Sequence, residues 1–486
     1  MTASPTVASQ STTRLDGQLG TRSIVFMVIA AAAPLTVIGG NVPLAVGSGN
    51  GAGAPIGFAL AAIILLLFSV GFVTMTPFVK EAGAFFSYVT AGLGSRLGLG
   101  TAFTALVAYT AIQVGVYGYM GWAVGDLVTY FGGPDLPWWL YSFAAMAIVA
   151  VLGYRHIDLS ARVLGVALAL EILVVVVLDI VIFATGGDSG IAMQTFDPAT
   201  VFTPGIGVAV LFALTGFIGF EATAVFRDEA RTPEKTIPRA TYIAVIVIGV
   251  FYAVSCWALI TGVGANNAVA VAQKTLAGDG NLLLDTATQY LGPIMRDVIQ
   301  VLLVTSLFAC VLSFHNVIAR YQFSLANKGV LPAALGRRHT RHHSPSVSSI
   351  VQTITAAVVL AVLALSGLDP LVGVFGSMAG VATVGMVILM LLTSVAVFFF
   401  FLRRPALAEG HAWGARVFPV LAVLGLIIAM WLVLSNFTLV TGGSVAVSTA
   451  LALVPVVALL LGIVLGARLR LDGGAAIDAD AEAPPA

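Results

Sequence analysis

Residues 204–226, PGIGVAVLFALTGFIGFEATAVF, are long and apolar enough to cross a membrane, and Gly216-Phe217-Ile218-Gly219 interrupts them near the middle. A similar stretch, residues 24–47 (IVFMVIAAAAPLTVIGGNVPLAVG), contains Gly39-Gly40-Asn41 at a comparable position. Glycine lets the backbone leave the helical conformation, and non-helical backbone in a bilayer persists only where protein or water shields it. The sequence therefore predicts two broken membrane helices.

The composition is that of an integral membrane protein. Of 486 residues, 59% are hydrophobic and 9% are charged, and the mean hydropathy is +1.04; soluble proteins carry about 25% charged residues. The 22 basic and 22 acidic residues cancel, which argues against nucleic acid as a partner. Zinc-ligand spacings, phosphate loops and nucleophile elbows are absent from the sequence. We therefore expect neither a metal nor a cofactor, and no enzymatic activity.

Counting apolar segments of about 20 residues predicts an all-α protein with twelve transmembrane helices. Residues 1–22 are expected to form a cytoplasmic tail, 23–470 the membrane domain, and 471–486 an acidic, disordered tail. The approximate spans are 24–47, 55–76, 98–124, 138–153, 161–185, 204–226, 240–263, 297–322, 347–366, 371–401, 417–437 and 445–467.

The basic residues predict the orientation in the cell membrane. With the N-terminus in the cytoplasm, only Lys274 and Arg296 of the 22 basic residues fall on the outside. Because basic loops stay in the cytoplasm, both termini are predicted to be cytoplasmic.

The first and sixth spans, both broken, begin two groups of five helices, about 24–185 and about 204–401, with extra helices at about 417–467. An odd number of helices inserts the second group upside down, so the two breaks meet near the middle of the bilayer. Unpaired backbone groups and helix ends at such breaks suit a carboxylate and an ammonium group, and inverted repeats with broken helices are typical of alternating-access transporters. A zwitterion of amino-acid size matches both ends.

Two further motifs identify the family that the chain resembles. FALTGFIGFEATAVFRDEARTPEKTIPRATY (Phe212 to Tyr242) resembles the sixth helix and following loop of amino acid–polyamine–organocation (APC) permeases, and LSFHNVIARYQFSLANKGVLP (Leu312 to Pro332) is similar to their eighth helix and its cytoplasmic exit. The resemblance covers nearly the whole chain. It implies a LeuT-like fold of ten core helices plus two, and secondary active transport of amino acids or related amines.

The resemblance also implies a substrate site. It places carboxylate contacts on the backbone of the first break, where Asn41 replaces a usual glycine, and amine contacts on the backbone around Phe217, Ile218 and Phe220. Thr215 stands where arginine/agmatine antiporters have a gating tryptophan, so we do not expect that activity. The predicted substrate site comprises Gly39, Gly40, Asn41, Thr215, Gly216, Phe217, Ile218, Gly219 and Phe220.

Acidic residues inside the spans are the predicted sites of proton coupling, because a charged carboxylate is unfavourable there and the protonated acid is not. Glu221 follows the second break, where some relatives have a pH-sensing glutamate. Glu171 lies where some proton-coupled relatives have a lysine in place of a sodium ion. Asp179 is expected nearer the outside, at the interface or in a vestibule. His315 is the third coupling candidate, although a structural hydrogen bond between helices explains it equally well.

The predicted function is proton-coupled symport of an amino acid or related amine by alternating access. An exchanger is the main alternative, and a transporter-like ligand sensor, a channel or an intramembrane enzyme are less favoured. The choice of substrate, uptake against export, proton against sodium coupling, and the oligomeric state stay open at this level.

Overall fold

The computed structural model describes residues 20–79, 84–155, 161–221, 223, 230–339 and 344–468, and every element within these ranges is a helix. Most of the two predicted tails lies outside the described residues. The long helices are α4 (Ala54–Met75), α6 (Ser95–Tyr130), α7 (Trp138–Arg155), α8 (Ala161–Thr185), α12 (Pro233–Val263), α15 (Pro293–Asn327), α16 (Ser346–Leu365), α17 (Ser377–Arg403), α18 (Phe418–Ser435) and α20 (Val445–Arg468). The shorter ones are α1 (Thr21–Ala31), α2 (Pro34–Thr36), α3 (Val42–Leu44), α5 (Ala84–Leu93), α9 (Pro198–Val201), α10 (Ile206–Gly216), α13 (Ala268–Leu276), α14 (Leu282–Leu291) and α19 (Phe437–Thr441).

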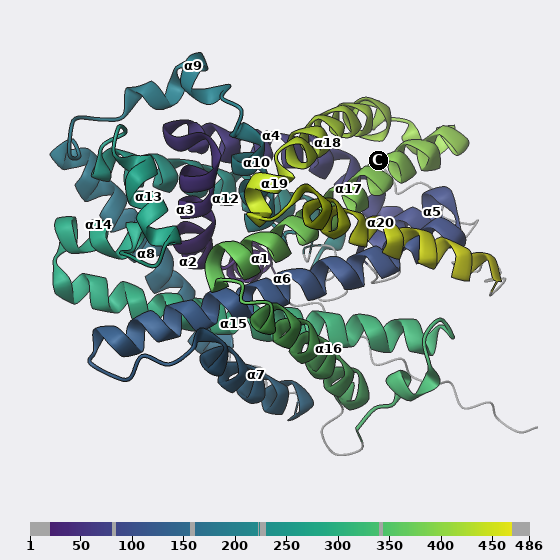
Figure 1. Ribbon diagram of the computed structural model, residues 1–486. Helices are drawn as coiled ribbons and strands as arrows, with labels where there is room; N and C mark the ends of the chain where they lie inside the picture. The colour runs from purple at the N-terminus through teal and green to yellow at the C-terminus, as the bar shows by residue number, and fades with distance from the viewer. Residues whose placement is uncertain are drawn as a thin grey trace, which may run out of the picture.

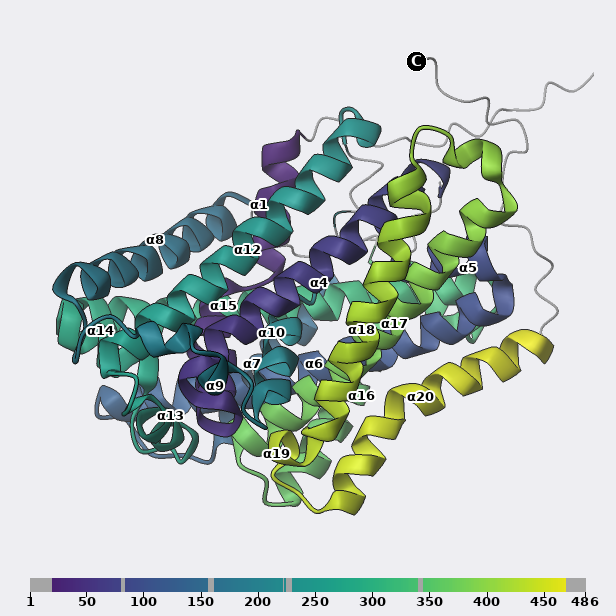
Figure 2. The same ribbon diagram turned by 90° about the horizontal axis from the view of Figure 1, so that it is seen from above.

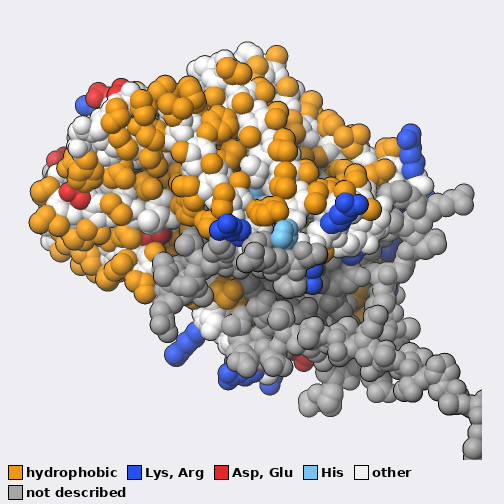
Figure 3. Space-filling view, turned by 90° about the horizontal axis from the view of Figure 1, so that it is seen from below, with side chains coloured by type: hydrophobic (Ala, Val, Ile, Leu, Met, Phe, Trp, Pro, Cys, Tyr) orange, Lys and Arg blue, Asp and Glu red, His pale blue; other side chains and the backbone are white. Residues whose placement is uncertain are grey.

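The helices form one bundle whose outer surface is apolar. Side chains such as Ile180, Ile428 and Leu461 are 58–62% exposed although they belong to the most hydrophobic helices. Hydrophobic side chains also cover much of the face drawn in Figure 3. An apolar surface of this extent is stable against lipid and not against water, so the surface confirms a multi-pass membrane protein.

Ten helical stretches among the described residues are long and apolar enough to cross a membrane. The first, Thr21–Phe78, contains the first two predicted spans, whereas the sixth predicted span contributes only the 11-residue helix α10. The all-α membrane fold is therefore confirmed, and the number of twelve spans stays a prediction.

Helices at matching positions in the two predicted groups of five make matching contacts. The first broken helix packs through α1 against α12, and the second packs through α10 against α4. Likewise α6 packs against α17 while α15 packs against α8. Helices α18 and α20 lie at one side of this core in both views (Figures 1 and 2).

Short helices close one end of the bundle, and the sequence did not lead us to expect them. Helices α13 and α14 lie together at the end opposite α5 (Figures 1 and 2). Helix α14 begins where the Asn281 side chain accepts a hydrogen bond from the Leu284 N–H at 3.1 Å. An asparagine in this capping position is a sequence signal from which α14 could have been predicted.

Candidate substrate site

The first membrane helix is broken seven residues earlier than predicted. Helix α1 ends at Ala31, Ala33 adopts the left-handed conformation (φ 46°, ψ 68°), and α2 begins at Pro34. Residues Val37–Asn41 form a π-helical turn with helical backbone angles throughout, so the predicted interruption at Gly39-Gly40-Asn41 was wrong. Proline lacks an N–H and disfavours the helical conformation of the residue before it, which explains a break at Ala33.

Gly39 and Gly40 have a packing role instead. A Cβ atom on either would lie 2.6 Å from the Tyr119 side chain, at its hydroxyl oxygen for Gly39 and at Cε1 for Gly40. These glycines therefore allow the ring of Tyr119 on α6 to approach the first broken helix.

The second break lies where the sequence predicts it. Helix α10 ends at Gly216, and Gly219 has a φ of +112°, a conformation that side chains other than glycine adopt at a cost. Phe217 and Phe220 are buried beside it: Phe217 packs edge-to-face on Tyr252, and Phe220 packs likewise on Phe68 of α4.

One side chain connects the two breaks. The hydroxyl of Tyr252, on α12, lies 3.1 Å from the carbonyl oxygen of Ala32 and 3.2 Å from that of Gly216, and it donates toward both. Both carbonyls are at helix ends, where backbone acceptors lack helical partners. The two interruptions therefore lie side by side, as predicted, although different residues form the first one.

A small cavity of about 20 Å³ lies at this junction. Four predicted site residues line it, namely Asn41, Thr215, Gly216 and Ile218. The unpredicted lining residues include Ala31, Ala32, Ala33, Thr36, Phe314 and Phe375. The volume accommodates about one water molecule, so the junction is closed in this conformation. Pro34 is the sequence signal from which the break at Ala31, Ala32 and Ala33, and hence their place in the site, could have been predicted.

Asn41 and Thr215 hold the walls of this cavity together. The Asn41 side-chain amide donates to the Phe212 carbonyl of α10 at 2.8 Å. The Thr215 hydroxyl lies 2.6 Å from that of Thr383, on α17. Each residue thus joins a broken helix to a neighbouring one while facing the cavity.

Glu221 closes the second break. One carboxylate oxygen accepts the Gly219 N–H at 3.0 Å, and the other accepts the hydroxyl of Tyr109, on α6, at 2.5 Å. Glu221 is 3% exposed. Its carboxyl group therefore couples the conformation of the broken helix to α6.

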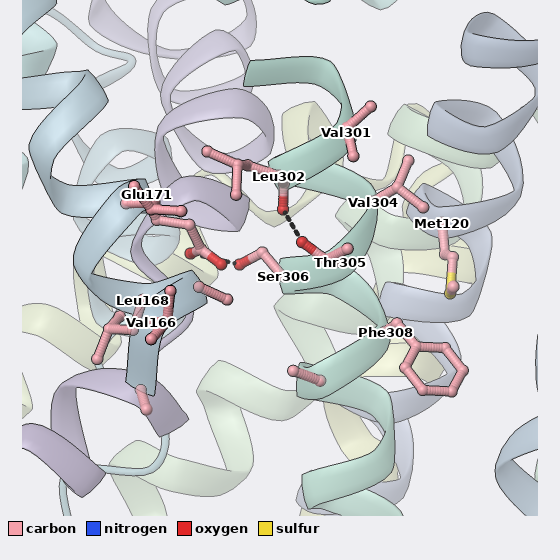
Figure 4. A pocket seen from close by; sticks show the side chains of 14 residues that line it. Met120, Val166, Leu168, Glu171, Val301, Leu302, Val304, Thr305, Ser306 and Phe308 are labelled. Atoms are coloured by element: carbon pink, nitrogen blue, oxygen red, sulfur yellow. Dashed lines mark hydrogen bonds between the residues drawn. The ribbon is translucent and has the colours of Figure 1, made fainter. Parts of the chain in front are cut away.

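Glu171 lies beside the first break. Its Oε2 atom accepts the Ser306 hydroxyl of α15 at 2.9 Å, as Figure 4 shows. The Thr36 hydroxyl donates to the Ser306 oxygen at 3.3 Å, and the backbone of Leu35 also interacts with the carboxyl group. A chain of polar groups thus leads from Glu171 to Thr36, at the wall of the central cavity.

The remaining titratable residues lie elsewhere. The His315 ring is 2.8 Å from the Ser349 hydroxyl of α16 and packs against Gly153 of α7. Asp179 was expected at an interface or vestibule, but it is 6% exposed and accepts the Ser255 hydroxyl of α12 at 2.6 Å. The expectation for Asp179 was wrong because α12 covers that face of α8.

Comparison with known proteins defines the class to which this fold and junction belong. The amino acid permease family model matches residues 19–462, so the chain belongs to this family, part of the APC superfamily.

Its relatives in the family are transporters. It is 24% identical over 433 residues to the branched-chain amino acid permease BcaP of Bacillus subtilis, covering 84% of this chain and 86% of BcaP. It is 22% identical to the serine/threonine exchanger SteT of the same organism, covering 85% and 92%. It is 23% identical to the lysine-specific permease LysP of Lactococcus lactis subsp. cremoris, covering 77% and 74%. The family supports transport of amino acids and no enzymatic activity.

Proposed function

We propose that this protein moves a neutral amino acid across the cell membrane by proton-coupled symport. The observation on which the proposal depends is the junction of two broken helices, joined by Tyr252 and flanked by Glu171 and Glu221. Breaks that meet inside a bundle leave backbone donors and acceptors for a zwitterion, and a conformational change must open the closed cavity to admit it.

The lining of the cavity favours an apolar substrate side chain. Ile112, Val116, Phe314 and Phe375 surround the polar groups of the breaks, and no charged residue is among the lining residues that the structure describes. A basic side chain would lack a partner there, and burying an unpaired charge is unfavourable. BcaP is a branched-chain amino acid permease, which agrees with this choice.

The proton is assigned to Glu171, with Glu221 as a second site. Glu171 contacts the first break through Ser306 and Thr36, so gain or loss of its proton changes the hydrogen bonds on which the break depends. Glu221 has the same relation to the second break through Gly219. His315 contacts neither break, and we assign it a structural role between α15 and α16.

Reconstituted vesicles test this function. We expect labelled leucine to accumulate when the outside is more acidic than the inside, and a protonophore to abolish the accumulation. Unlabelled isoleucine and valine should compete, whereas lysine should not. If uptake does not depend on the pH gradient but requires amino acid inside the vesicles, the proposal of symport is wrong and the protein is an exchanger. Exchange is the activity named for SteT.

A further inference from the structure

A second cavity, separate from the junction, opens on the outer surface of the bundle. It has a volume of about 700 Å³ and lies between α8 and α15. Val166 and Leu170 of α8 and Val301 of α15 line it and are 46–57% exposed. Figure 4 shows Glu171 at its inner wall, pointing across toward Ser306.

The lining is apolar except at one place. Glu171, Ser306 and Thr305 are its polar residues, and the rest are aliphatic side chains, Met120 and Phe308. Glu171 is the only ionisable group among the lining residues that the structure describes. A carboxylate in such surroundings is stabilised strongly by a cation, and the described lining of the cavity contains no lysine or arginine to supply one.

The opening lies at the depth of the lipid acyl chains. Glu171 lies inside the candidate membrane span Gly165–Thr185, six residues or about 9 Å along the helix axis from its start, and so within a hydrocarbon core of about 30 Å. A ligand reaching this opening from outside the bundle therefore arrives dissolved in the bilayer. Free amino acids do not partition there, but an alkylamine does in its uncharged form.

We propose that this cavity binds a lipophilic primary amine. The alkyl chain lies along the apolar walls at Val166, Leu170 and Val301, and the nitrogen reaches Glu171. The amine nitrogen accepts the proton of the Glu171 carboxylic acid, which gives an ammonium–carboxylate pair with no change in total charge. The Ser306 hydroxyl continues to donate to the carboxylate.

Photolabelling of the purified protein in lipid nanodiscs tests the site. The probe is dodecylamine with a diazirine near the end of its chain, and the matched probe is the corresponding alcohol. We expect the amine to label peptides containing Val166 or Phe308 at least about tenfold more strongly than the alcohol does, because only the amine forms the ion pair. Excess dodecylamine should remove the labelling.

Two variants decide whether the carboxyl group and the cavity are both required. Glu171→Gln should reduce labelling by the amine to the level of the alcohol. Ala309→Phe keeps the acid but fills the cavity from α15, so it should reduce labelling by both probes. Equal labelling by amine and alcohol, or labelling unchanged in Glu171→Gln, would overturn the proposal and indicate a groove for lipid acyl chains. Because the readout is binding, it is independent of the transport proposed above.

Discussion

At the scale of single residues, Glu171 is the side chain through which we expect the proton to act. Glu171→Gln keeps the size and the hydrogen bond to Ser306 but cannot exchange a proton. We expect leucine accumulation driven by a pH gradient to fall at least about tenfold, with exchange of leucine across the membrane retained, because only the driven step needs the proton. Uptake and counterflow in the same vesicles separate the two activities.

His315→Gln is the matched control for this variant. The ring contacts Ser349 and Gly153 and neither break, so its replacement should change protein stability and leave the pH dependence of uptake unaltered. If His315→Gln abolished driven accumulation while Glu171→Gln did not, the two assignments would have to be exchanged.

Tyr252 is a positioning residue at the junction. Tyr252→Phe removes the hydroxyl that joins the carbonyls of Ala32 and Gly216, and an unsatisfied buried acceptor costs about 1–3 kcal/mol. We expect lower thermal stability and a transport rate reduced more than protein level. Tyr290→Phe is the control, because its hydroxyl donates to the Gly262 carbonyl, ten residues or about 15 Å along α12 from Tyr252, and it should leave transport unchanged.

At the scale of elements, the two breaks differ in how far the sequence predicts them. Gly219 needs its positive φ, so the second break is visible in the sequence. Gly39 and Gly40 allow Tyr119 to pack closely, a role that depends on α6, from a distant part of the sequence. The burial of Asp179 could not be predicted for the same reason, because the residue that covers it, Ser255, belongs to the distant helix α12. Long apolar segments predicted the all-α membrane fold, because a membrane-spanning helix can be recognised from local composition.

Pro34 is the residue on which the first break depends. Pro34→Ala restores a backbone N–H and removes the restriction on Ala33, so α1 should extend through Ala33 and close the break. We expect transport to fall by about tenfold or more with little loss of thermal stability, since a left-handed alanine costs about 1–2 kcal/mol. Uptake by vesicles that contain the purified variant tests the loss of transport, and its melting temperature tests the thermal stability.

Pro43→Ala is the control for the helix break. Asn41 and Val42 before Pro43 and Ala45 after it have helical backbone angles, so Pro43 breaks no helix, and its replacement should leave transport near the wild-type rate. Loss of transport in Pro43→Ala with full activity in Pro34→Ala would contradict this assignment and indicate that the functional break lies in the segment Gly39-Gly40-Asn41.

At the scale of the whole molecule, the placement of α13 and α14 makes the proposed orientation testable. These helices lie at the end of the bundle opposite α5, and Asp279 between them is exposed. Ala334, in the loop after α15, is also exposed and belongs to the end proposed to be cytoplasmic. The two positions should therefore be on opposite sides of the membrane.

Single cysteines at these positions measure the orientation directly, because the native Cys256 and Cys310 are buried. In intact cells, a membrane-impermeant maleimide should label Asp279→Cys and spare Ala334→Cys, whereas both should react once the membrane is permeabilised. The reverse pattern would place the basic loops outside, against their usual preference for the cytoplasm. It would leave the sign of the gradient needed for uptake unchanged, because a symporter moves proton and amino acid in the same direction in either orientation.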